Sequence, residues 1–189
     1  MPKSHLTSVA DGNRSPSPNT LLPLIAQGDR DALGMLYSQL HGAIYGYAFS
    51  IVKNESDAQD ILHDCFLAIV KNSGAYRDQG NAKAWIFTIA KNLCIQKLRD
   101  RQKADMPDWE TWKTIPDRET ESDDRLVVEA CLQHLSEEER QIVVLHAVSG
   151  FRHREIASFL NLPLSTVLSK YNRSLKKLNK FLTEKEREQ

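Results

Sequence analysis

The chain has little of what secreted, membrane-spanning and metal-scaffolded proteins depend on. Its 189 residues include only three cysteines, which are widely spaced and form no CxxC or CxxH pair. A disulfide framework or a zinc knuckle is therefore not expected, and the cysteines are predicted to be small packing residues in a reducing compartment. No run approaches the roughly 18 apolar residues of a membrane span, and the stretch LLPLIA is too short for the apolar core of a signal peptide. We expect a cytoplasmic protein without stable membrane insertion.

Catalytic and cofactor-binding motifs are also missing. The six histidines are scattered, and the sequence holds no HExxH, P-loop or GxSxG motif. Asp60, His63 and Asp64 share one side of a predicted helix, but polar groups at this spacing more often form a solvated or partner-binding face than a metal or acid–base site. We therefore expect no enzyme activity, no catalytic residues, no metal and no cofactor.

Strand patterns are absent as well, because no alternating β-branched run is long enough. Helical periodicity fills most of the chain instead, and two capping boxes, Ser56 with Gln59 and Ser136 with Glu139, are predicted to begin helices. The expected fold is all-α, with two small helical domains joined by a flexible acidic linker and a helix-turn-helix in the second. The expected boundaries are a disordered tail over 1–19, a helical domain over 20–103, a linker over 104–124, a helix-turn-helix domain over 125–183 and a tail over 184–189.

The formal net charge of zero hides a strong segregation of charge. Residues 81–103 hold six bases and one acid, residues 104–124 hold eight acids and two bases, and residues 150–180 hold seven bases and one acid. Each basic block falls on a predicted amphipathic helix. Summed charge of this kind steers association, so the pattern favours a polyanionic partner over a merely solvated surface.

The last predicted helix, from about Ser165 to Leu182, divides into two faces. Its expected buried stripe consists of Val167, Tyr171, Leu175, Leu178 and Leu182. The opposite face carries Ser165, Ser169, Asn172, Arg173, Lys176 and Lys180, and a short helix over 152–160 and a tight turn precede it. Arg suits guanine edges, Asn adenine edges, and Lys and Ser phosphates, so this helix-turn-helix is predicted to read a major groove. Leu168, at the edge of the face, contacts a thymine methyl or widens the core.

The predicted helix that follows Gly80 and Asn81 is divided in the same way. Its apolar side consists of Ala82, Ile86, Ile89, Ala90 and Leu93. Its polar side consists of Asn81, Trp85, Thr88, Asn92, Gln96 and Arg99. An aromatic ring among amides and a base suits single-stranded nucleic acid, whose bases stack on rings and bond through their edges. Trp85 has a second interpretation, as a core residue of a small bundle.

Taken together, the two halves resemble a known family. The first half contains SDAQDILHDCFLAIV and YRDQGNAKAWIFTIAKNLCIQKLRDRQK, and the second contains LSEEERQIVVLHAVSGFRHREIASFLNLPLSTVLSKYNRSLKKL. Over about 21–182, the chain resembles a bacterial RNA polymerase sigma factor of the small extracytoplasmic-function (ECF) type. The second half alone is also similar to LuxR-type output domains of response regulators, but the first half lacks the α/β receiver pattern of those proteins.

The resemblance implies a transcription initiation factor that binds core RNA polymerase, recognises the −35 promoter element as duplex and melts the −10 element of promoter DNA. The positions that match the family's polymerase contact are Gln59, Asp60, His63, Asp64 and Leu67. Those that match its −10 contacts are Asn81, Lys83, Trp85, Thr88, Lys91, Asn92, Gln96 and Arg99. Those that match its −35 contacts are Arg152, Arg154, Ser165, Thr166, Leu168, Ser169, Lys170, Asn172, Arg173, Lys176 and Lys177. An anti-sigma factor is implied as a further partner.

The chain departs from the family pattern at a few of these positions. Ser165 stands where the family usually has Gly, Leu168 and Lys170 stand where a basic residue and an Arg are frequent, and Gln96 occupies a common Asp position. These changes bear on promoter sequence preference rather than on the role. The alternative function is a two-domain helix-turn-helix transcriptional regulator that does not bind core polymerase.

Overall fold

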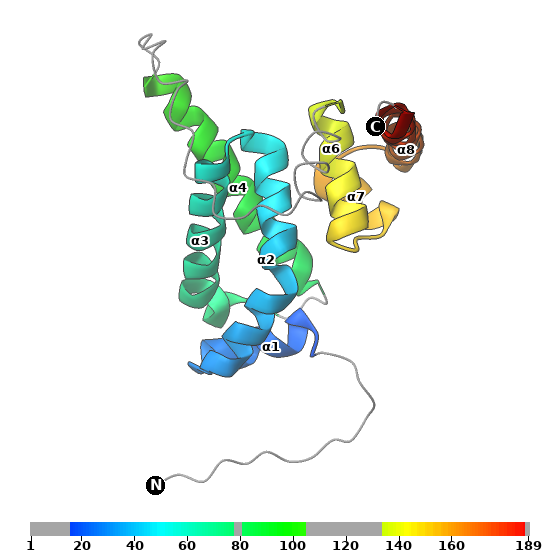
Figure 1. Cartoon of the computed structure of the whole chain (residues 1–189). Coiled ribbons are helices and arrows are strands. Elements are labelled where there is room, and N and C mark those ends of the chain that lie inside the picture. Colours follow the sequence, from blue (N-terminus) through cyan, green and yellow to red (C-terminus); the bar gives the residue numbers. More distant parts are fainter. Residues whose placement is uncertain (1–15, 78–80, 105–133, 188–189) are drawn as a thin grey trace, which may run out of the picture.

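The computed structural model describes residues 16–77, 81–104 and 134–187, and every regular element within these ranges is a helix (Figure 1). The first unit contains α1 (Pro18–Ala26), α2 (Arg30–Val52), α3 (Glu55–Asn72), the 3-10 turn η1 (Ser73–Ala75) and α4 (Ala82–Ala104). The second contains α6 (Glu137–Val143), the π-helical segment η3 (Val144–Val148) that continues it, α7 (His153–Leu160) and α8 (Leu164–Arg187). The predicted all-α fold is confirmed.

The element ends differ in detail from the expected domain boundaries. Helix α1 begins at Pro18, inside the tail expected over 1–19, and α8 continues to Arg187, past the expected end at 183. Apart from Ala104, the last residue of α4, the expected linker lies outside the described residues, and so do its Trp109 and Trp112.

One of the two predicted capping boxes forms. Ser136 Oγ accepts a hydrogen bond from the Glu139 N–H, and the Glu139 carboxylate accepts one from the Ser136 N–H at 2.9 Å, so α6 begins as expected. The box predicted at Ser56 is wrong. Asn54 caps α3 instead, because its Oδ1 accepts a hydrogen bond from the Asp57 N–H at 2.9 Å.

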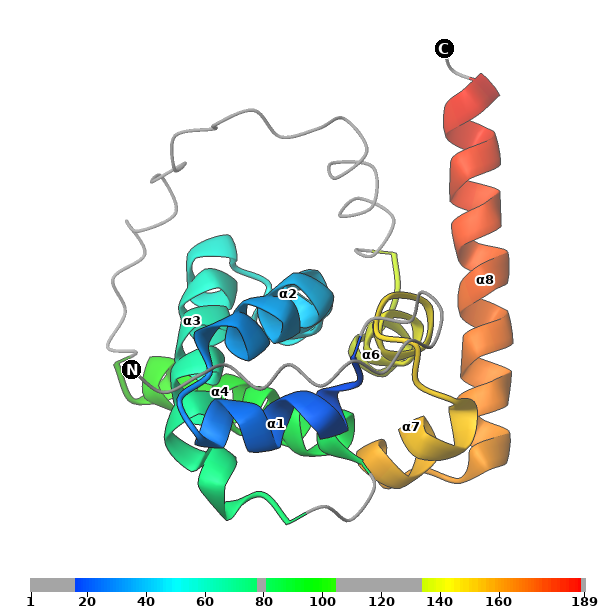
Figure 2. The ribbon, with the colours of Figure 1, turned by 90° about the horizontal axis from the view of Figure 1, so that it is seen from below.

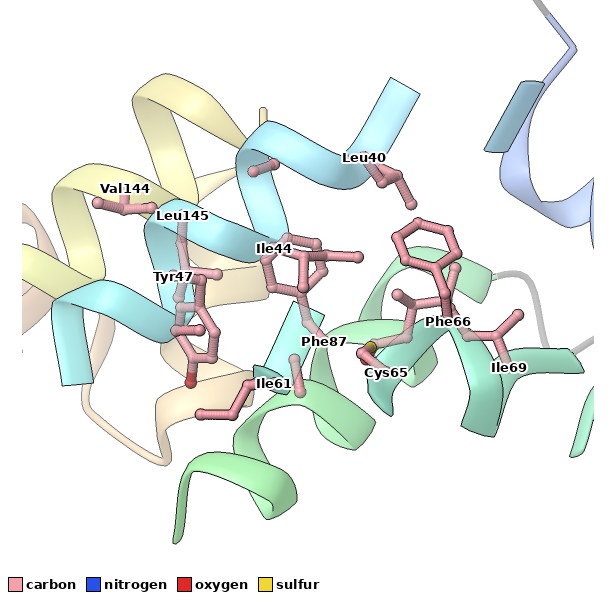
Figure 3. Close-up of a cluster of buried hydrophobic side chains, with 14 of the residues drawn as sticks. Leu40, Ile44, Tyr47, Ile61, Cys65, Phe66, Ile69, Phe87, Val144 and Leu145 are labelled. Carbon is pink, nitrogen blue, oxygen red and sulfur yellow. The ribbon is translucent and has the colours of Figure 1, made fainter. Parts of the chain in front are cut away.

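Helix α2 carries the core of the first unit, and α1, α3 and α4 pack around it. Its buried side chains recur on helical steps: Leu36, Leu40, Ile44, Tyr47 and Ile51. Figure 3 shows part of this cluster between α2, α3 and α4. Cys65 and Cys94 are buried free thiols within it, as predicted, and burial raises the pKa of each to about 12. The third cysteine, Cys131, lies outside the described residues.

The second unit packs directly against the first, an arrangement that the sequence did not predict. Helix α2 contacts both α6 and η3, and Figure 3 shows Val144 and Leu145 beside Tyr47. The Phe87 ring of α4 lies 5.1 Å from that of Phe151 in an edge-to-face arrangement. The buried side chains of both units therefore form one continuous hydrophobic cluster. Seen from below in Figure 2, α8 stands along the outer side of the second unit, away from α2.

Candidate nucleic-acid interface

The start of α4 borders a hollow with an aromatic wall. The hollow has a volume of about 450 Å³ and is lined by Ala75, Tyr76, Arg77, Asn81, Ala84, Trp85 and Thr88. The Tyr76 and Trp85 rings lie 5.3 Å apart and tilted by 53°. This volume falls within the roughly 300–1,000 Å³ of typical small-ligand sites. Trp85 therefore fits both interpretations that the sequence left open, since it is half-buried against Tyr76 and also lines the hollow.

Two lining residues, Tyr76 and Arg77, were not among the predicted site residues. Their signal was available, because an aromatic and a base lie a few positions before Gly80 and Asn81 in the sequence. Asn81 has a structural task as well, since its Oδ1 accepts a hydrogen bond from the Ala84 N–H at 3.0 Å and so caps α4.

The other residues predicted for −10 DNA divide into two groups along α4. Thr88, Asn92, Gln96 and Arg99 are exposed, on the same polar side as Trp85. Lys83 and Lys91 are half-buried and directed at the second unit instead. Lys83 Nζ donates a hydrogen bond to the Ser149 carbonyl at 2.8 Å, and Lys91 Nζ donates one to the Phe159 carbonyl at 3.4 Å. The structure therefore does not bring these lysines together with the hollow.

The residues predicted to contact polymerase share an exposed strip of α3. All five, Gln59, Asp60, His63, Asp64 and Leu67, are exposed. Lys97 of α4 contacts one of them, because its Nζ lies 3.0 Å from Asp60 Oδ2, and the hydrogen bond with Asp60 is the main cause that raises the pKa of Lys97. Asp57, nearby on α3, contacts both Lys97 and Arg101.

Apolar side chains continue this strip. Leu67 and Val70 are 56% and 45% exposed, unusually high for large aliphatic residues. Tyr37 of α2 is also exposed, with its ring 4.9 Å from that of Phe66. A surface with carboxylates at one end and exposed apolar groups at the other suits a protein partner.

Helices α7 and α8 form the predicted helix-turn-helix. Asn161 ends α7 in the left-handed conformation, with φ of 55°, and α8 begins three residues later. Most of the predicted −35 residues are exposed: Arg152, Arg154, Ser165, Leu168, Ser169, Asn172, Arg173, Lys176 and Lys177. Thr166 and Lys170 are half-buried.

Two of these lysines pair with carboxylates of α6. Lys170 Nζ lies 2.8 Å from Glu138 Oε2, and Lys177 Nζ lies 2.7 Å from Glu139 Oε2. Although burial opposes it, the contact with Lys177 lowers the pKa of the Glu139 carboxyl, together with the capping bond from Ser136. Lys170 and Lys177 therefore join α8 to α6 in addition to any role at DNA.

The buried stripe of α8 also differs from the prediction. Val167 is buried and Tyr171 and Leu178 are half-buried as expected, but Leu175 and Leu182 are 44% and 41% exposed. The side chain that follows Tyr171 on the buried side is Ser174, whose Oγ donates to the Lys170 carbonyl at 2.8 Å. The sequence pattern did not predict Ser174 at a buried position because it selects apolar residues. A hydroxyl that is hydrogen-bonded within its own helix can be buried at little cost.

Comparison with known proteins identifies both units. The description "Sigma-70 region 2" matches residues 36–104, and "Sigma-70, region 4" matches residues 125–178. The chain belongs to the sigma-70 family, in its ECF group. Region 2 therefore comprises most of α2 together with α3 and α4, and region 4 includes α6, α7 and most of α8.

Relatives along almost the full length agree with this assignment. The ECF RNA polymerase sigma factor SigM of Mycobacterium tuberculosis is 26% identical over 182 residues, which cover 96% of this chain and 93% of SigM. The structure of CnrH in complex with the cytosolic domain of CnrY has a TM-score of 0.62 at 24% identity and covers 88% of this chain and 97% of CnrH. RpoE of Bartonella quintana, solved with the anti-sigma factor NepR, has a TM-score of 0.61 at 23% identity and covers 79% of this chain and 96% of RpoE. These two structures share the fold. None of the helices that the structure describes is both long and apolar enough to cross a membrane.

Proposed function

We propose that this ECF sigma factor binds core RNA polymerase through α3, reads a −35 element as duplex with α8, and opens the −10 element at the hollow beside α4. The observation that carries the proposal is the contrast between the two DNA faces. One is a recessed aromatic hollow at a helix start, and the other is a projecting helix face of Arg, Asn, Lys and Ser.

The hollow suits a base that has left the stack. Trp85 and Tyr76 supply ring surface, and Asn81, Arg77 and Thr88 supply hydrogen-bonding groups at its rim. Stacking of a base on an aromatic side chain contributes about 1–3 kcal/mol. This arrangement stabilises unpaired DNA relative to duplex, which is how strand opening is promoted without any covalent step by the chain itself.

The face of α8 suits closed duplex. Arg173 and Asn172 occupy adjacent exposed positions, and Lys176 lies one turn beyond. Arg and Asn make bidentate contacts with guanine and adenine edges, each worth about 1–3 kcal/mol of discrimination. Lys and Ser contacts to phosphates position the helix but add salt sensitivity.

Neither face is expected to suffice alone. Two modules on one chain raise each other's effective concentration at a promoter that carries both elements, and polymerase bound to α3 fixes their spacing. We further propose that the protein acts in the bacterial cytoplasm, and that an anti-sigma factor covers one of these surfaces, as NepR binds the RpoE of Bartonella quintana.

Run-off transcription tests the proposal. Purified core polymerase with this chain should produce discrete transcripts from fragments of the source genome, and core polymerase alone should not. A variant in which two α3 acids are replaced, Asp60→Lys with Asp64→Lys, should give no transcripts while its circular dichroism spectrum remains unchanged. Tight, sequence-specific duplex binding by the free chain with no effect on polymerase would instead favour the regulator that never binds polymerase.

A further inference from the structure

We propose that region 4 holds the free sigma factor closed by occupying two lysines of the −10 face, so that region 4 and DNA compete for the same ammonium groups. The inference rests on the proposed function, because it concerns regulation of the α4 face. It starts from the contacts of Lys83 and Lys91, which α4 directs at region 4 rather than at the hollow.

Each lysine contacts one backbone carbonyl and one aromatic ring of region 4. Lys83 Nζ donates to the Ser149 carbonyl at 2.8 Å and lies 5.6 Å from the centroid of the Phe151 ring. Lys91 Nζ donates to the Phe159 carbonyl at 3.4 Å and lies 5.2 Å from the centroid of the ring of the same residue. A carbonyl oxygen and an aromatic face both attract an ammonium group, and partial burial strengthens the attraction.

The two carbonyls belong to the carboxyl-terminal ends of helices. Ser149 is the C-cap of η3, and Phe159 is the penultimate residue of α7. The last carbonyls of a helix lack intrahelical partners, and the helix dipole places roughly half a negative charge there. Region 4 thus offers Lys83 and Lys91 oxygen acceptors in a negative field, which is the chemistry that a DNA phosphate would offer. A phosphate and a helix end cannot bind the same ammonium group in the same place.

Apolar packing supports the closed arrangement. The Tyr47 ring of α2 lies 6.0 Å from that of Phe159, and the Phe87 ring of α4 lies 5.1 Å from that of Phe151, both edge to face. Val144 of η3 lies beside Tyr47 in Figure 3. Aromatic pairs between the two units therefore add stability to the arrangement in which the lysine contacts form.

The expected consequence is a reduced affinity of the free chain for DNA. Only the open form presents Lys83 and Lys91, so the apparent dissociation constant equals the intrinsic one divided by the open fraction. If the closed form outnumbers the open form by about ten to one, the apparent affinity falls about tenfold, and a variant that opens the chain regains it.

Gly46 provides a way to open the chain without changing either lysine. A Cβ at this position of α2 would lie 3.6 Å from Val144 Cγ1, so Gly46→Ala fits and the longer side chain of Gly46→Gln must displace region 4. Gly42, four residues earlier on the same helix, has no atom within 4 Å of such a Cβ. Gly42→Gln is therefore the matched control, and circular dichroism checks that all three variants retain their helices. Phe159→Ala, which removes a half-buried ring, is a second opening variant should Gly46→Gln lose helical content.

The first measurement is the rate at which N-hydroxysuccinimide acetate acylates individual lysines of the full chain, read by mass spectrometry. Lys71, exposed on α3, is the internal reference. In the unmodified chain and in Gly42→Gln, Lys83 and Lys91 should react about tenfold more slowly than Lys71, and opening by Gly46→Gln should remove most of that protection. Equal rates at all three lysines in the unmodified chain would overturn the closed form.

The second measurement is the affinity of the same proteins for fluorescein-labelled oligo(dT), read by anisotropy. Gly46→Gln should bind more tightly than the unmodified chain, by the factor that its acylation shows, and Gly42→Gln and Gly46→Ala should not. Faster acylation without tighter binding would overturn the competition. Both readouts use the free chain, so their failure differs from failure of the proposed function, which would appear as absent run-off transcription with core polymerase.

Discussion

Helices α4 and α8 carry comparable basic charge, but the bases that are already engaged contact different parts of the molecule. On α4, Lys83 and Lys91 contact region 4, and Lys97 contacts two carboxylates of α3. On α8, Lys170 and Lys177 pair with carboxylates of α6, within region 4 itself, whereas Arg173 and Lys176 are exposed and form no ion pair with any residue that the structure describes. A count of charges therefore indicates two candidate nucleic-acid faces, but only the packing shows which charges are already engaged.

The strongest effect is expected at α3, whose exposed acids are proposed to bind core polymerase. Asp60→Lys with Asp64→Lys should abolish binding to core polymerase, measured by co-elution, because both carboxylates are exposed and the change reverses the charge of the strip. Asp31→Lys with Glu184→Lys makes the same charge change at exposed sites elsewhere and should leave binding intact. Equal binding of core polymerase by both double variants would show that the α3 acids do not form the polymerase contact.

Two bases one turn apart on α8 allow a direct comparison of Arg173, which forms no ion pair with a described residue, with Lys177, which is paired. Arg173→Ala should weaken holoenzyme binding to the closed promoter by about 1–3 kcal/mol and relax preference at one −35 position, with unchanged thermal stability. Lys177→Ala should act mainly on stability instead, because it leaves the Glu139 carboxylate, only 4% exposed, without its ion-pair partner. Electrophoretic mobility shift and thermal denaturation of both variants separate the two effects. If both variants lost promoter binding and thermal stability to the same extent, pairing with α6 would not distinguish a structural base from a DNA-binding one.

A smaller difference is expected from pH, and it should be confined to region 4. The His146 and His153 rings stack at 4.1 Å, and burial, aided by the charge of His146, lowers the pKa of His153. Because the folded chain binds a proton at His153 less readily than the unfolded chain does, protonation favours the unfolded state. The free energy of unfolding should therefore decrease as pH falls below about 6.5, the ordinary pKa of histidine. His153→Gln should therefore flatten the fall in melting temperature between pH 7 and pH 5.5.

His63→Gln, at an exposed position of α3, is the control for that measurement. It should retain the pH dependence of the unmodified chain. Glu139 does not contribute within this window, because the ordinary glutamate pKa of 4.5 in the unfolded chain and the lowered pKa in the folded chain both lie below pH 5.5. If His63→Gln and His153→Gln behaved alike, the stacked pair would not be the source of the pH dependence.

The smallest effect is expected at the contact between the two regions. Tyr47 is fully buried, burial raises the pKa of its hydroxyl, and Oη has no hydrogen-bond partner among the described residues. Tyr47→Phe keeps the ring and removes an unsatisfied polar group, so the free energy of unfolding should be unchanged or higher by about 1 kcal/mol. Chemical denaturation measures it, and a clear loss of stability would mean that the hydroxyl makes a stabilising contact.

Local rules predicted most of the fold. Apolar spacing identified the long helices, and Ser136 with Glu139 correctly placed the start of α6, because these signals act within a few residues. Ser56 failed because Asn54 also offers a side-chain oxygen near the first turn, and sequence alone did not rank the two. The prediction that Leu175 is buried failed because helical spacing shows which residues share a face but not whether another element covers it.

The sequence predicted the chemical character of the candidate faces more fully than the contacts that their residues make. Residue chemistry suggested a duplex face and a single-stranded face, which stay predictions; the structure shows that most of the predicted α8 residues are exposed and that Trp85 lines a hollow. The partners of Lys83 and Lys177 lie 66 and 38 positions away along the chain, so no local pattern could reveal them. Contacts of this range follow from how the two units pack, which depends on every buried side chain at once.

The division of labour between the two DNA faces is tested most directly by single-round transcription with core polymerase on closed and pre-melted forms of one promoter. Asn81→Ser, which keeps an oxygen to cap α4 and removes the amide, is compared with Arg173→Ala. We expect both variants to be impaired on the closed promoter, and a pre-melted −10 bubble to restore most of the activity of Asn81→Ser while Arg173→Ala stays impaired. Rescue of Arg173→Ala but not of Asn81→Ser would contradict the account and reverse the roles of the two units.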